Sequence, residues 1–399
     1  MLQFIRSTGL NVWLLVLAQG LSMTTLNVNM IIVGLSGLAI APEPWLATLP
    51  LSLQFVASML STLPASILMG KIGRRPVFLF GIFLFTIGMT GLGVSLIMKH
   101  FIAFMICSVL VGMAHGINQF YRYAAADSVE ESQKPVVVSL VLAGGLVAAV
   151  LGTSIVKNTI TLYPETIYAG CFFAAATLQI IAFPILLSLK IQKPEKQKHI
   201  GRPLSAFFKM PRFLAGLIGA ALGYAVMSFM MTAAPLQIVS VSKLSDAANA
   251  TVIQWHVIAM FAPSFFTGAL IKRFTVQRVM ACGLILYGLA IPIALNGFTF
   301  WHYFIVLALI GGGWNTLYVG GSSIIAAIAT PQERAKVQGI TDFIITFSIA
   351  TASLSAGAMH YLLGWQMMAK LTLIPIVLIA LMIVLMVRSE QKDAQDNPA

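Results

Sequence analysis

Two titratable side chains stand inside long apolar stretches of this sequence. His115 lies in "GMAHGINQF" and Asp342 lies in "QGITDFIITF". A histidine titrates near pH 6.5 when unperturbed, so modest desolvation lets His115 exchange protons across the physiological range. Gln119 follows His115 by four residues, which puts both side chains on one face of a helix. The pattern predicts a proton-exchanging site inside an apolar protein.

Catalytic signatures are missing. The sequence has no G-x-x-x-x-G-K-S/T nucleotide loop and no H-E-x-x-H metal motif, and most of its 12 acidic residues fall in predicted loops or tails. Cys107, Cys171 and Cys282 lie in predicted helices without metal-type spacing, so we expect free thiols. These observations argue against an enzyme, and we predict no cofactor and no bound metal.

The elements that carry these residues are transmembrane helices. Of 399 residues, 59% are apolar and 9% are charged, against roughly 45–50% and about 25% in soluble domains. A membrane-spanning helix needs about 20 mostly apolar residues. We predict twelve such helices, at 11–36, 46–69, 76–97, 101–126, 136–157, 166–189, 213–238, 248–271, 277–297, 300–326, 336–360 and 367–387.

The distribution of lysine and arginine predicts the orientation. If the N-terminus is cytoplasmic, 19 of these residues fall in inside segments and four fall outside. Cytoplasmic loops carry such an excess, so we expect both termini in the cytoplasm. The formal charge of +12 is then mostly an orientation signal and an attraction to anionic lipid, and we predict no nucleic-acid partner.

The predicted helices form two halves. Residues 191–212 are the one long, basic, polar interruption, and we predict that they link a six-helix half at 1–190 to a second at 213–399. The halves echo one another, because "SILMGKIGRRPV" begins at Ser66 and "GALIKRFTVQRV" begins 202 residues later, at Gly268. Glu131 and Glu333 show the same offset. We infer a tandem repeat, as found in some secondary transporters.

Two six-helix halves, a basic central loop and a basic turn between helices two and three resemble the major facilitator superfamily over nearly the whole chain. The family's loop motif reads approximately G-x-x-x-D-R-x-G-R-R/K, and "SILMGKIGRR" matches it in type at Lys71, Gly73, Arg74 and Arg75. The acidic position is Gly70, so the usual contact of that acid is absent. The second copy keeps the basic residue at Arg273.

Two marks of the proton-driven drug exporters of this family are missing. Ser108 stands in helix four where they carry an arginine, and Gly152 in helix five precedes Thr153 rather than a proline. Helix five keeps a stripe of small residues, Gly144, Ala148 and Gly152, that allows close helix packing or rocking of the halves.

The resemblance implies a gate at the basic loop. In the family this loop pairs with an acid at the inner end of helix four, and the sequence offers Asp127 there. We expect Arg74 or Arg75 to pair with Asp127 in one conformation and to release it in another. A solvated loop that obeys the positive-inside rule is the alternative.

The resemblance also implies a central cavity lined by helices one, four, seven and ten. Buried polar groups are expensive inside a membrane, so those on these helices are candidates for substrate binding, with a helix-to-helix hydrogen bond as the alternative for each. An aromatic and amide lining suits a small, partly apolar molecule. The candidates are Gln19, Asn27, His115, Asn118, Gln119, Tyr224, Trp314, Asn315 and Tyr318.

We therefore predict a monomeric secondary transporter of a small organic solute in the bacterial inner membrane. It would work by alternating access, coupled to protons through His115 or Asp342, with lipids around it. For Asp342 the alternative is an acceptor for the basic loop. The alternative functions are an efflux antiporter for drugs or metabolites, and a membrane sensor or assembly partner that has kept the fold and lost transport.

Overall fold

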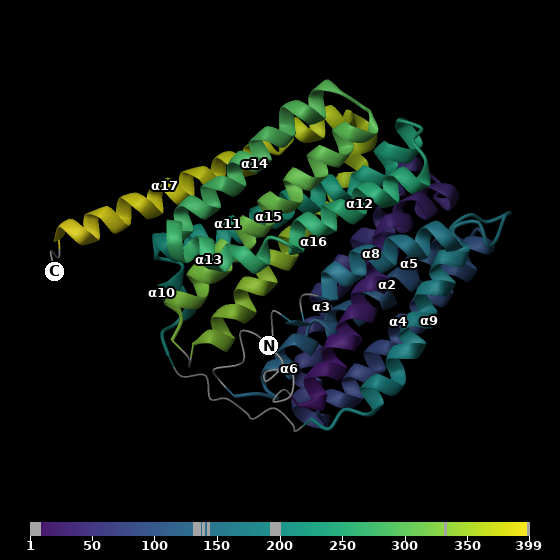
Figure 1. Cartoon of the computed structure of the whole chain (residues 1–399), viewed down its shortest axis with the longest axis horizontal. Coiled ribbons are helices and arrows are strands. Elements are labelled where there is room, and N and C mark those ends of the chain that lie inside the picture. The colour runs from purple at the N-terminus through teal and green to yellow at the C-terminus, as the bar shows by residue number, and fades with distance from the viewer. Residues whose placement is uncertain are drawn as a thin grey trace. The chain divides into compact units, whose positions relative to one another are not determined.

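The computed structural model describes residues 9–130, 137, 140–141, 144–191, 201–330 and 333–396, and these contain helices but no strand (Figure 1). The first helices are α2 (Leu10–Ile40), η1 (Pro44–Leu46), α3 (Leu49–Ile72), α4 (Arg74–Ile97), α5 (Phe101–Asn118), α6 (Tyr121–Ala126), α8 (Gly144–Thr159) and α9 (Ala169–Leu187). They are followed by α10 (Leu204–Phe207), α11 (Pro211–Pro235), η2 (Leu236–Val241), α12 (Asp246–Phe261), α13 (Ser264–Phe274), α14 (Val276–Asn296), α15 (Phe300–Ile328), α16 (Arg334–Leu371) and α17 (Leu373–Asp396).

Within this described part, nine helices are long and apolar enough to cross a membrane. One of them, Lys336–Gln391, has 56 residues. At 1.5 Å per residue it is about 84 Å long, far more than the ~30 Å hydrocarbon core of a bilayer. Gly364 interrupts it with φ 73°, so it holds two crossings. With α12 and α13 as one bent span and α8 in the segment predicted at 136–157, the helices agree with the twelve expected from the sequence.

Three of the predicted helices are interrupted. A turn at Gln119–Phe120 separates α5 from α6, α12 and α13 meet at a 40° bend, and α11 passes into the π-helix η2. Two of these breaks occur at Pro263 and Pro235, since proline lacks an N–H and clashes with the preceding turn. The sequence prediction of continuous helices rested on the length of the apolar runs. A proline kink does not shorten such a run, so these breaks were not predicted.

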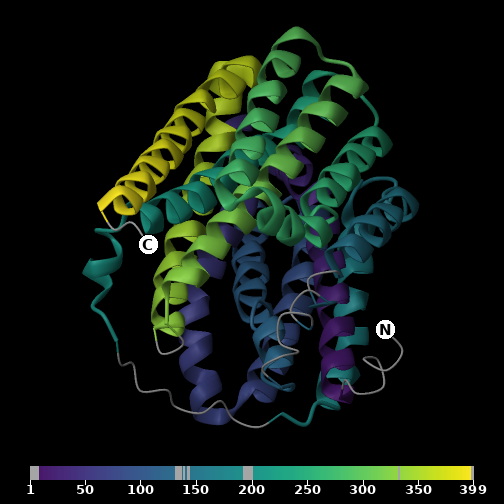
Figure 2. The ribbon, with the colours of Figure 1, turned by 60° about the vertical axis from the view of Figure 1, so that its left-hand side comes forward.

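The chain divides into two units, each with its own packing. Unit 1 is Met1–Lys196 with Ser245–Gln254, and unit 2 is Gln197–Leu244 with Trp255–Ala399. In unit 1, α2 packs against α8 and α9, and α4 packs against α5. In unit 2, α11 packs against α16 and α17, and α14 packs against α15 (Figures 1 and 2). The same pattern occurs in both units, in agreement with a repeated six-helix unit.

A tight turn also recurs at the repeat offset. Gly73 joins α3 to α4 with φ 94° and ψ 165°, and Thr275 joins α13 to α14 with φ 79° and ψ 153°. The two positions are 202 residues apart, the offset of the sequence repeat. Glycine adopts this conformation freely, whereas a β-branched threonine is strained in it. The turn geometry is therefore kept in both units, although only one copy has kept the residue that favours it.

The end of the linker is fastened to the loop between α15 and α16. Glu333 is buried and accepts hydrogen bonds from the Arg202 main-chain N and Nε at 2.8 Å and from Arg202 Nη2 at 2.7 Å. The Thr330 amide donates to the same carboxylate at 3.0 Å, and Lys336 Nζ donates to the Arg202 carbonyl at 2.5 Å. An apolar cluster lies next to this site and consists of Phe207, Phe213, Leu217, Ile325, Ala329 and Val337.

This network determines how the carboxyl group titrates. The Arg202 guanidinium first, then the main-chain amides of Arg202 and Thr330, hold the pKa of Glu333 far below its usual range. A depressed carboxylate pKa stabilises the folded state above the unfolded pKa of about 4.3, and this stabilisation is lost as pH falls toward the folded pKa. The linker end is thus an integral part of unit 2 at neutral pH.

Glu333→Gln should lower the melting temperature of the purified protein at pH 7, because a neutral amide cannot replace a carboxylate that accepts charge-assisted bonds. Below about pH 4 the difference from wild type should shrink, since the wild-type carboxylate then begins to lose its own advantage. Glu390→Gln serves as control, because Glu390 is one-third exposed and its nearest Arg212 nitrogen is 3.6 Å away. Equal melting shifts for both variants would contradict this assignment.

Candidate functional site

An aromatic cluster lies in unit 2 where α11, α12 and α15 meet. The Trp314 and Tyr318 rings are stacked, with centroids 5.2 Å apart and planes at 9°. Tyr224 meets both rings edge-on at 5.1 and 5.7 Å, and Phe261 lies 5.8 Å from Trp314. Trp314 and Tyr318 are four residues apart and so share one helix face. The cluster gathers three of the predicted substrate-binding residues into one aromatic surface.

Close packing of α11 on α15 sets the position of these rings. A Cβ atom added at Gly321 would lie 2.3 Å from the Gly216 carbonyl oxygen, so the two backbones touch directly. Small residues allow this approach between membrane helices. It brings Tyr224 of α11 against the Trp314 and Tyr318 rings of α15.

Trp314 also carries a polar group without a partner. Its side chain is buried, and among the described residues its Nε1 has no hydrogen-bond acceptor. An indole N–H usually finds an acceptor when it is buried. The cluster therefore holds one buried N–H donor for which the described residues offer no acceptor.

Asn315, the neighbour of Trp314, is engaged within the protein. Its fully buried Nδ2 donates to the Met260 carbonyl at 2.7 Å and to Ser264 Oγ at 2.6 Å, and its Oδ1 accepts from Thr267 Oγ1 at 2.7 Å. These bonds span the bend between α12 and α13. The Met260 carbonyl is one of those that the break at Pro263 frees, so Asn315 satisfies a buried backbone group. Its geometry favours the helix-to-helix alternative raised for it above.

His115 and Gln119 form a pair in unit 1, as their spacing predicts. Gln119 Nε2 lies 3.0 Å from His115 Nε2. An amide nitrogen only donates, so the imidazole nitrogen accepts and the neutral ring carries its proton on Nδ1. His115 Nδ1 has no hydrogen-bond partner within the described chain. The pair therefore presents one N–H donor and can take up a second proton if the Gln119 amide turns over.

The three remaining candidate amides of unit 1, Gln19, Asn27 and Asn118, are packed between helices. Asn118 Nδ2 donates to Ser22 Oγ at 3.1 Å, while its Oδ1 lies beside Gly81 of α4. The Asn27 Oδ1 lies against Gly152 of α8, on the small-residue stripe. Gln19 is buried on α2, with no partner for its Oε1 in the part of the chain described. Asn27 and Asn118 thus fill contacts with glycines, where weak Cα–H···O contacts can form.

Several polar contacts went unnoticed in the sequence. Asn29 Nδ2 donates to Gln54 Oε1 at 2.7 Å, and Gln179 Nε2 donates to Thr25 Oγ1 at 2.7 Å. Each joins two different helices, with partners 25 and 154 residues apart in the chain, so the spacing within one helix could not reveal them. Phe261 was also missed, although its place just before Pro263 marks it as the end of a helix.

The basic loop lies at the turn between α3 and α4. Arg74 is buried, and its Nη2 lies 2.5 Å from the Asp127 Oδ2 at the end of α6, whereas about half of the Asp127 side chain is exposed. Gly73 supplies the positive φ that aims Arg74 inward. Both partners belong to unit 1, so the ion pair fixes the loop against α6 within that unit.

The other candidates near the helix ends are more exposed. Arg75 and Lys71 are exposed beside the pair, and Arg273 lies over the Phe274 ring at 5.2 Å. Asp342 is half-buried on α16, and its main-chain carbonyl accepts from Thr346 Oγ1 at 2.8 Å. Glu131 and residues 192–200 of the linker lie outside the described residues.

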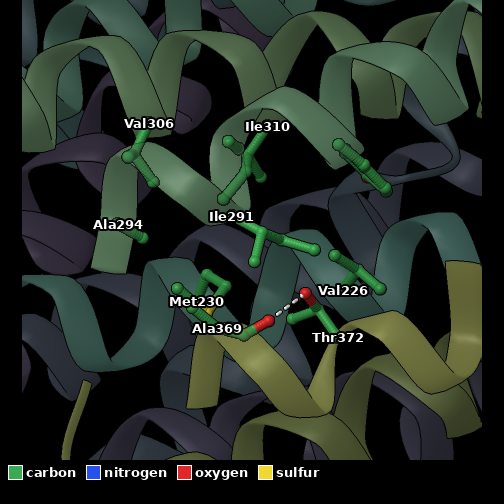
Figure 3. A pocket seen from close by; sticks show the side chains of 10 residues that line it. Val226, Met230, Ile291, Ala294, Val306, Ile310, Ala369 and Thr372 are labelled. Atoms are coloured by element: carbon green, nitrogen blue, oxygen red, sulfur yellow. Dashed lines mark hydrogen bonds between the residues drawn. The ribbon is translucent and has the colours of Figure 1, made fainter. Parts of the chain in front are cut away.

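A small cavity inside unit 2 is not a substrate site. Figure 3 shows it between α11, α14, α15 and α16, lined by side chains such as Met230, Ile291 and Ile310. The Thr372 hydroxyl donates its hydrogen bond to the Ala369 carbonyl at 2.6 Å, so its proton is not offered to a ligand in the cavity. The volume of this cavity is about 10 Å³, which is close to the minimum that holds one water molecule.

Comparisons with known proteins agree with this architecture. Residues 12–262 and 241–399 match the family model described as Major Facilitator Superfamily. The riboflavin transporter RfnT of Brucella anthropi is 36% identical over 379 residues, which cover 92% of this chain and 95% of the relative. The uncharacterized MFS-type transporter YddS of Bacillus subtilis is 25% identical, over 72% of this chain and 70% of its own length.

Solved structures share the fold at low sequence identity. A mutant of the nucleoside transporter NupG is 14% identical with a TM-score of 0.72, over 95% of this chain and 100% of that one. A bacterial homologue of the lysosomal transporter Spinster is 14% identical with a TM-score of 0.70, over 96% and 97%. The family match over nearly the whole chain, the identity to RfnT and the long apolar helices of the described residues lead to one conclusion: the chain belongs to the major facilitator superfamily and is a multi-pass membrane transporter of a small solute.

Proposed function

We propose that this protein transports riboflavin or a closely related flavin. The aromatic cluster of Tyr224, Phe261, Trp314 and Tyr318 carries the proposal, because the isoalloxazine ring of a flavin is flat, aromatic and edged with hydrogen-bond acceptors. The identity of 36% to a riboflavin transporter along nearly the whole chain supports it. The exporter residues missing from helices four and five speak against drug efflux.

The chemistry of the cluster suits this ligand. Stacking of a heteroaromatic ring on an aromatic side chain is worth about 1–3 kcal/mol per ring. The Trp314 N–H, which has no acceptor among the described residues, would donate to a flavin carbonyl or ring nitrogen. A neutral flavin also needs no charged partner, in keeping with a cluster made of uncharged side chains.

Trp314→Ala should weaken riboflavin binding by about 5- to 150-fold, the range that corresponds to the loss of one stacked ring. Quenching of flavin fluorescence by the purified protein measures the affinity, and growth of a riboflavin-requiring bacterium on limiting riboflavin measures transport. Trp301→Ala is the matched control, because Trp301 lies on the same helix with its side chain 63% exposed. If the wild-type protein neither binds riboflavin nor supports growth, the proposed substrate is wrong.

Transport by alternating access and coupling to protons are further parts of the proposal. We place the chain in the bacterial cytoplasmic membrane as a monomer with both termini in the cytoplasm, in keeping with the lysine and arginine distribution. His115 is our first candidate for the proton carrier, since its Nδ1 has no partner among the described residues and its Nε2 contacts a reversible amide. Asp342 is the second candidate.

His115→Gln should retain substrate binding and exchange of labelled for unlabelled riboflavin in proteoliposomes, because exchange need not move a net proton. Accumulation driven by a proton gradient should collapse, since glutamine cannot change its charge. The paired variant Asp342→Asn tests the other candidate in the same assay. Intact accumulation in His115→Gln with loss in Asp342→Asn would transfer the role to Asp342, and normal accumulation in both would favour a facilitator without proton coupling.

The ion pair between Arg74 and Asp127 is our candidate for the inner gate. Because the pair lies within one unit, it would act by holding the α3–α4 loop in the position that one conformation requires, and its loss would shift the population of states. Breaking it leaves the buried Arg74 guanidinium without its acid, which costs more than the loss of an exposed pair.

Asp127→Asn should shift the protein toward the inward-open state and reduce transport while leaving expression largely intact. A cysteine at Gly70 can report this change, because a Cβ at that exposed position meets no atom within 4 Å. With the exposed native Cys282 replaced, labelling of Gly70→Cys from the cytoplasmic side should be faster in Asp127→Asn. Glu130→Gln controls for the loss of a nearby exposed acid. Unchanged labelling in Asp127→Asn would contradict the gate and leave the positive-inside rule as the explanation of the basic loop.

A further inference from the structure

A second, larger cavity lies in unit 2 and shares no lining residue with the aromatic cluster. It has a volume of about 380 Å³ and lies between α11, α16 and α17. Leu217 and Leu222 of α11 form one wall and Leu378 and Leu385 of α17 the other. Leu378 and Leu385 are 46% and 50% exposed, so this wall is open to the surroundings of the helices. We call it the α11–α17 groove.

The groove is apolar throughout. Its one hydroxyl, that of Ser348 on α16, donates to the Ile344 carbonyl at 2.9 Å and so needs no other partner. All three helices belong to membrane spans. In a membrane, the apolar groups next to such a surface are the acyl chains of lipids. The volume of the groove falls within the ~300–1,000 Å³ that is typical of ligand sites.

One end of the groove is marked by positive charge. Arg212 lies in the first turn of α11, five residues or about 7.5 Å along the helix axis from Leu217. Lys209 precedes it and Arg388 follows Leu385 on α17, and all three side chains are exposed. The nearest Arg212 nitrogen lies 3.6 Å from Glu390 Oε1, so the two helix ends meet there.

Glu390, the one acid at this end among the described side chains, is partly engaged. Glu390 Oε2 accepts from Gln277 Nε2 at 2.6 Å, while its other oxygen makes the long contact with Arg212. A half-exposed pair at this distance contributes little. Among the described side chains, three basic groups against one shared carboxylate leave a net positive charge at the mouth of the groove.

We propose that the α11–α17 groove binds one anionic phospholipid, with an acyl chain along Leu217, Leu222, Leu378 and Leu385 and the phosphate near Lys209, Arg212 and Arg388. An acyl chain gains no hydrophobic free energy by leaving other lipid chains. Preference for this lipid must therefore come from the charge of its headgroup and from the shape of the groove. The site is independent of the flavin proposal, since it shares no residue with the aromatic cluster.

Native mass spectrometry of the delipidated full-length protein in detergent tests this site, with phosphatidylglycerol and phosphatidylcholine of identical chains as probes. The wild type should retain phosphatidylglycerol more strongly. Each basic residue contributes about 5-fold near an anionic headgroup, so Lys209→Gln with Arg212→Gln should weaken phosphatidylglycerol binding by about 30-fold and leave phosphatidylcholine unchanged. Lys71→Gln with Arg75→Gln is the matched control, since it removes two exposed charges from the basic loop of unit 1.

A groove variant tests the acyl chain separately. Leu381 lines the groove with its side chain 54% exposed, so Leu381→Trp should narrow the groove without disturbing the protein interior and should weaken binding of phosphatidylglycerol. Equal weakening by the control pair would mean unspecific attraction to basic loops and would overturn the proposal. Three other results would also overturn the proposal. They are unchanged binding in Leu381→Trp, equal retention of the two lipids by the wild type, and displacement of phosphatidylglycerol by an equal concentration of glycerol phosphate.

Discussion

The interior of a membrane offers no water, so each polar group in the spans must find its partner within the chain. This constraint explains most polar contacts of the structure. Asn315 satisfies a carbonyl freed at the α12–α13 bend, Asn29 and Gln54 satisfy each other, and Gln179 bonds to Thr25. The same constraint singles out groups that find none in the described chain, above all the Trp314 Nε1 and the His115 Nδ1. These are where a substrate or a proton would complete the bonding.

Glycine residues at the helix contacts are the second feature on which the packing of the spans depends. Backbones that touch, as at Gly216 and Gly321, bring aromatic side chains from two helices into one cluster. In unit 1, glycines of neighbouring helices accommodate the amides of Asn27 and Asn118. Dispersion between closely packed helices replaces the hydrophobic effect, which lipid cannot supply. The aromatic surface is therefore a consequence of backbone packing as much as of the residues that display it.

Most charged side chains lie near the helix ends, and their environment differs from one site to the next. Glu333 is enclosed by Arg202 and two main-chain amides, which suits a permanent fastening of the linker end. Asp127 holds Arg74 from a half-exposed position, which suits a contact that opens and closes. Near Arg212 the Glu390 carboxylate is shared with Gln277, so the exposed Arg212 is only weakly paired. Exposure and the number of donors, rather than the residue types, separate these three cases.

Much of this protein could be read from its sequence. Apolar runs of about 20 residues determine the number of helices, because a helix must match the thickness of the bilayer. The 202-residue offset, the motif at Lys71 to Arg75 and the i, i+4 spacings of His115 with Gln119 and of Trp314 with Tyr318 are likewise local patterns. Each involves residues that a single helix or turn brings together, so spacing alone is sufficient.

Only the tertiary structure decided which polar residues remain available. Nothing local distinguishes Asn315, engaged at a bend, from Trp314 beside it, whose N–H finds no acceptor among the described residues. The Glu333 carboxylate and its Arg202 partner are 131 residues apart, and the α11–α17 groove joins three helices from across unit 2. Hydrogen-bond partners and cavities depend on which helix faces meet, and a repeating apolar pattern leaves those faces unspecified because nearly every face of a membrane helix is apolar.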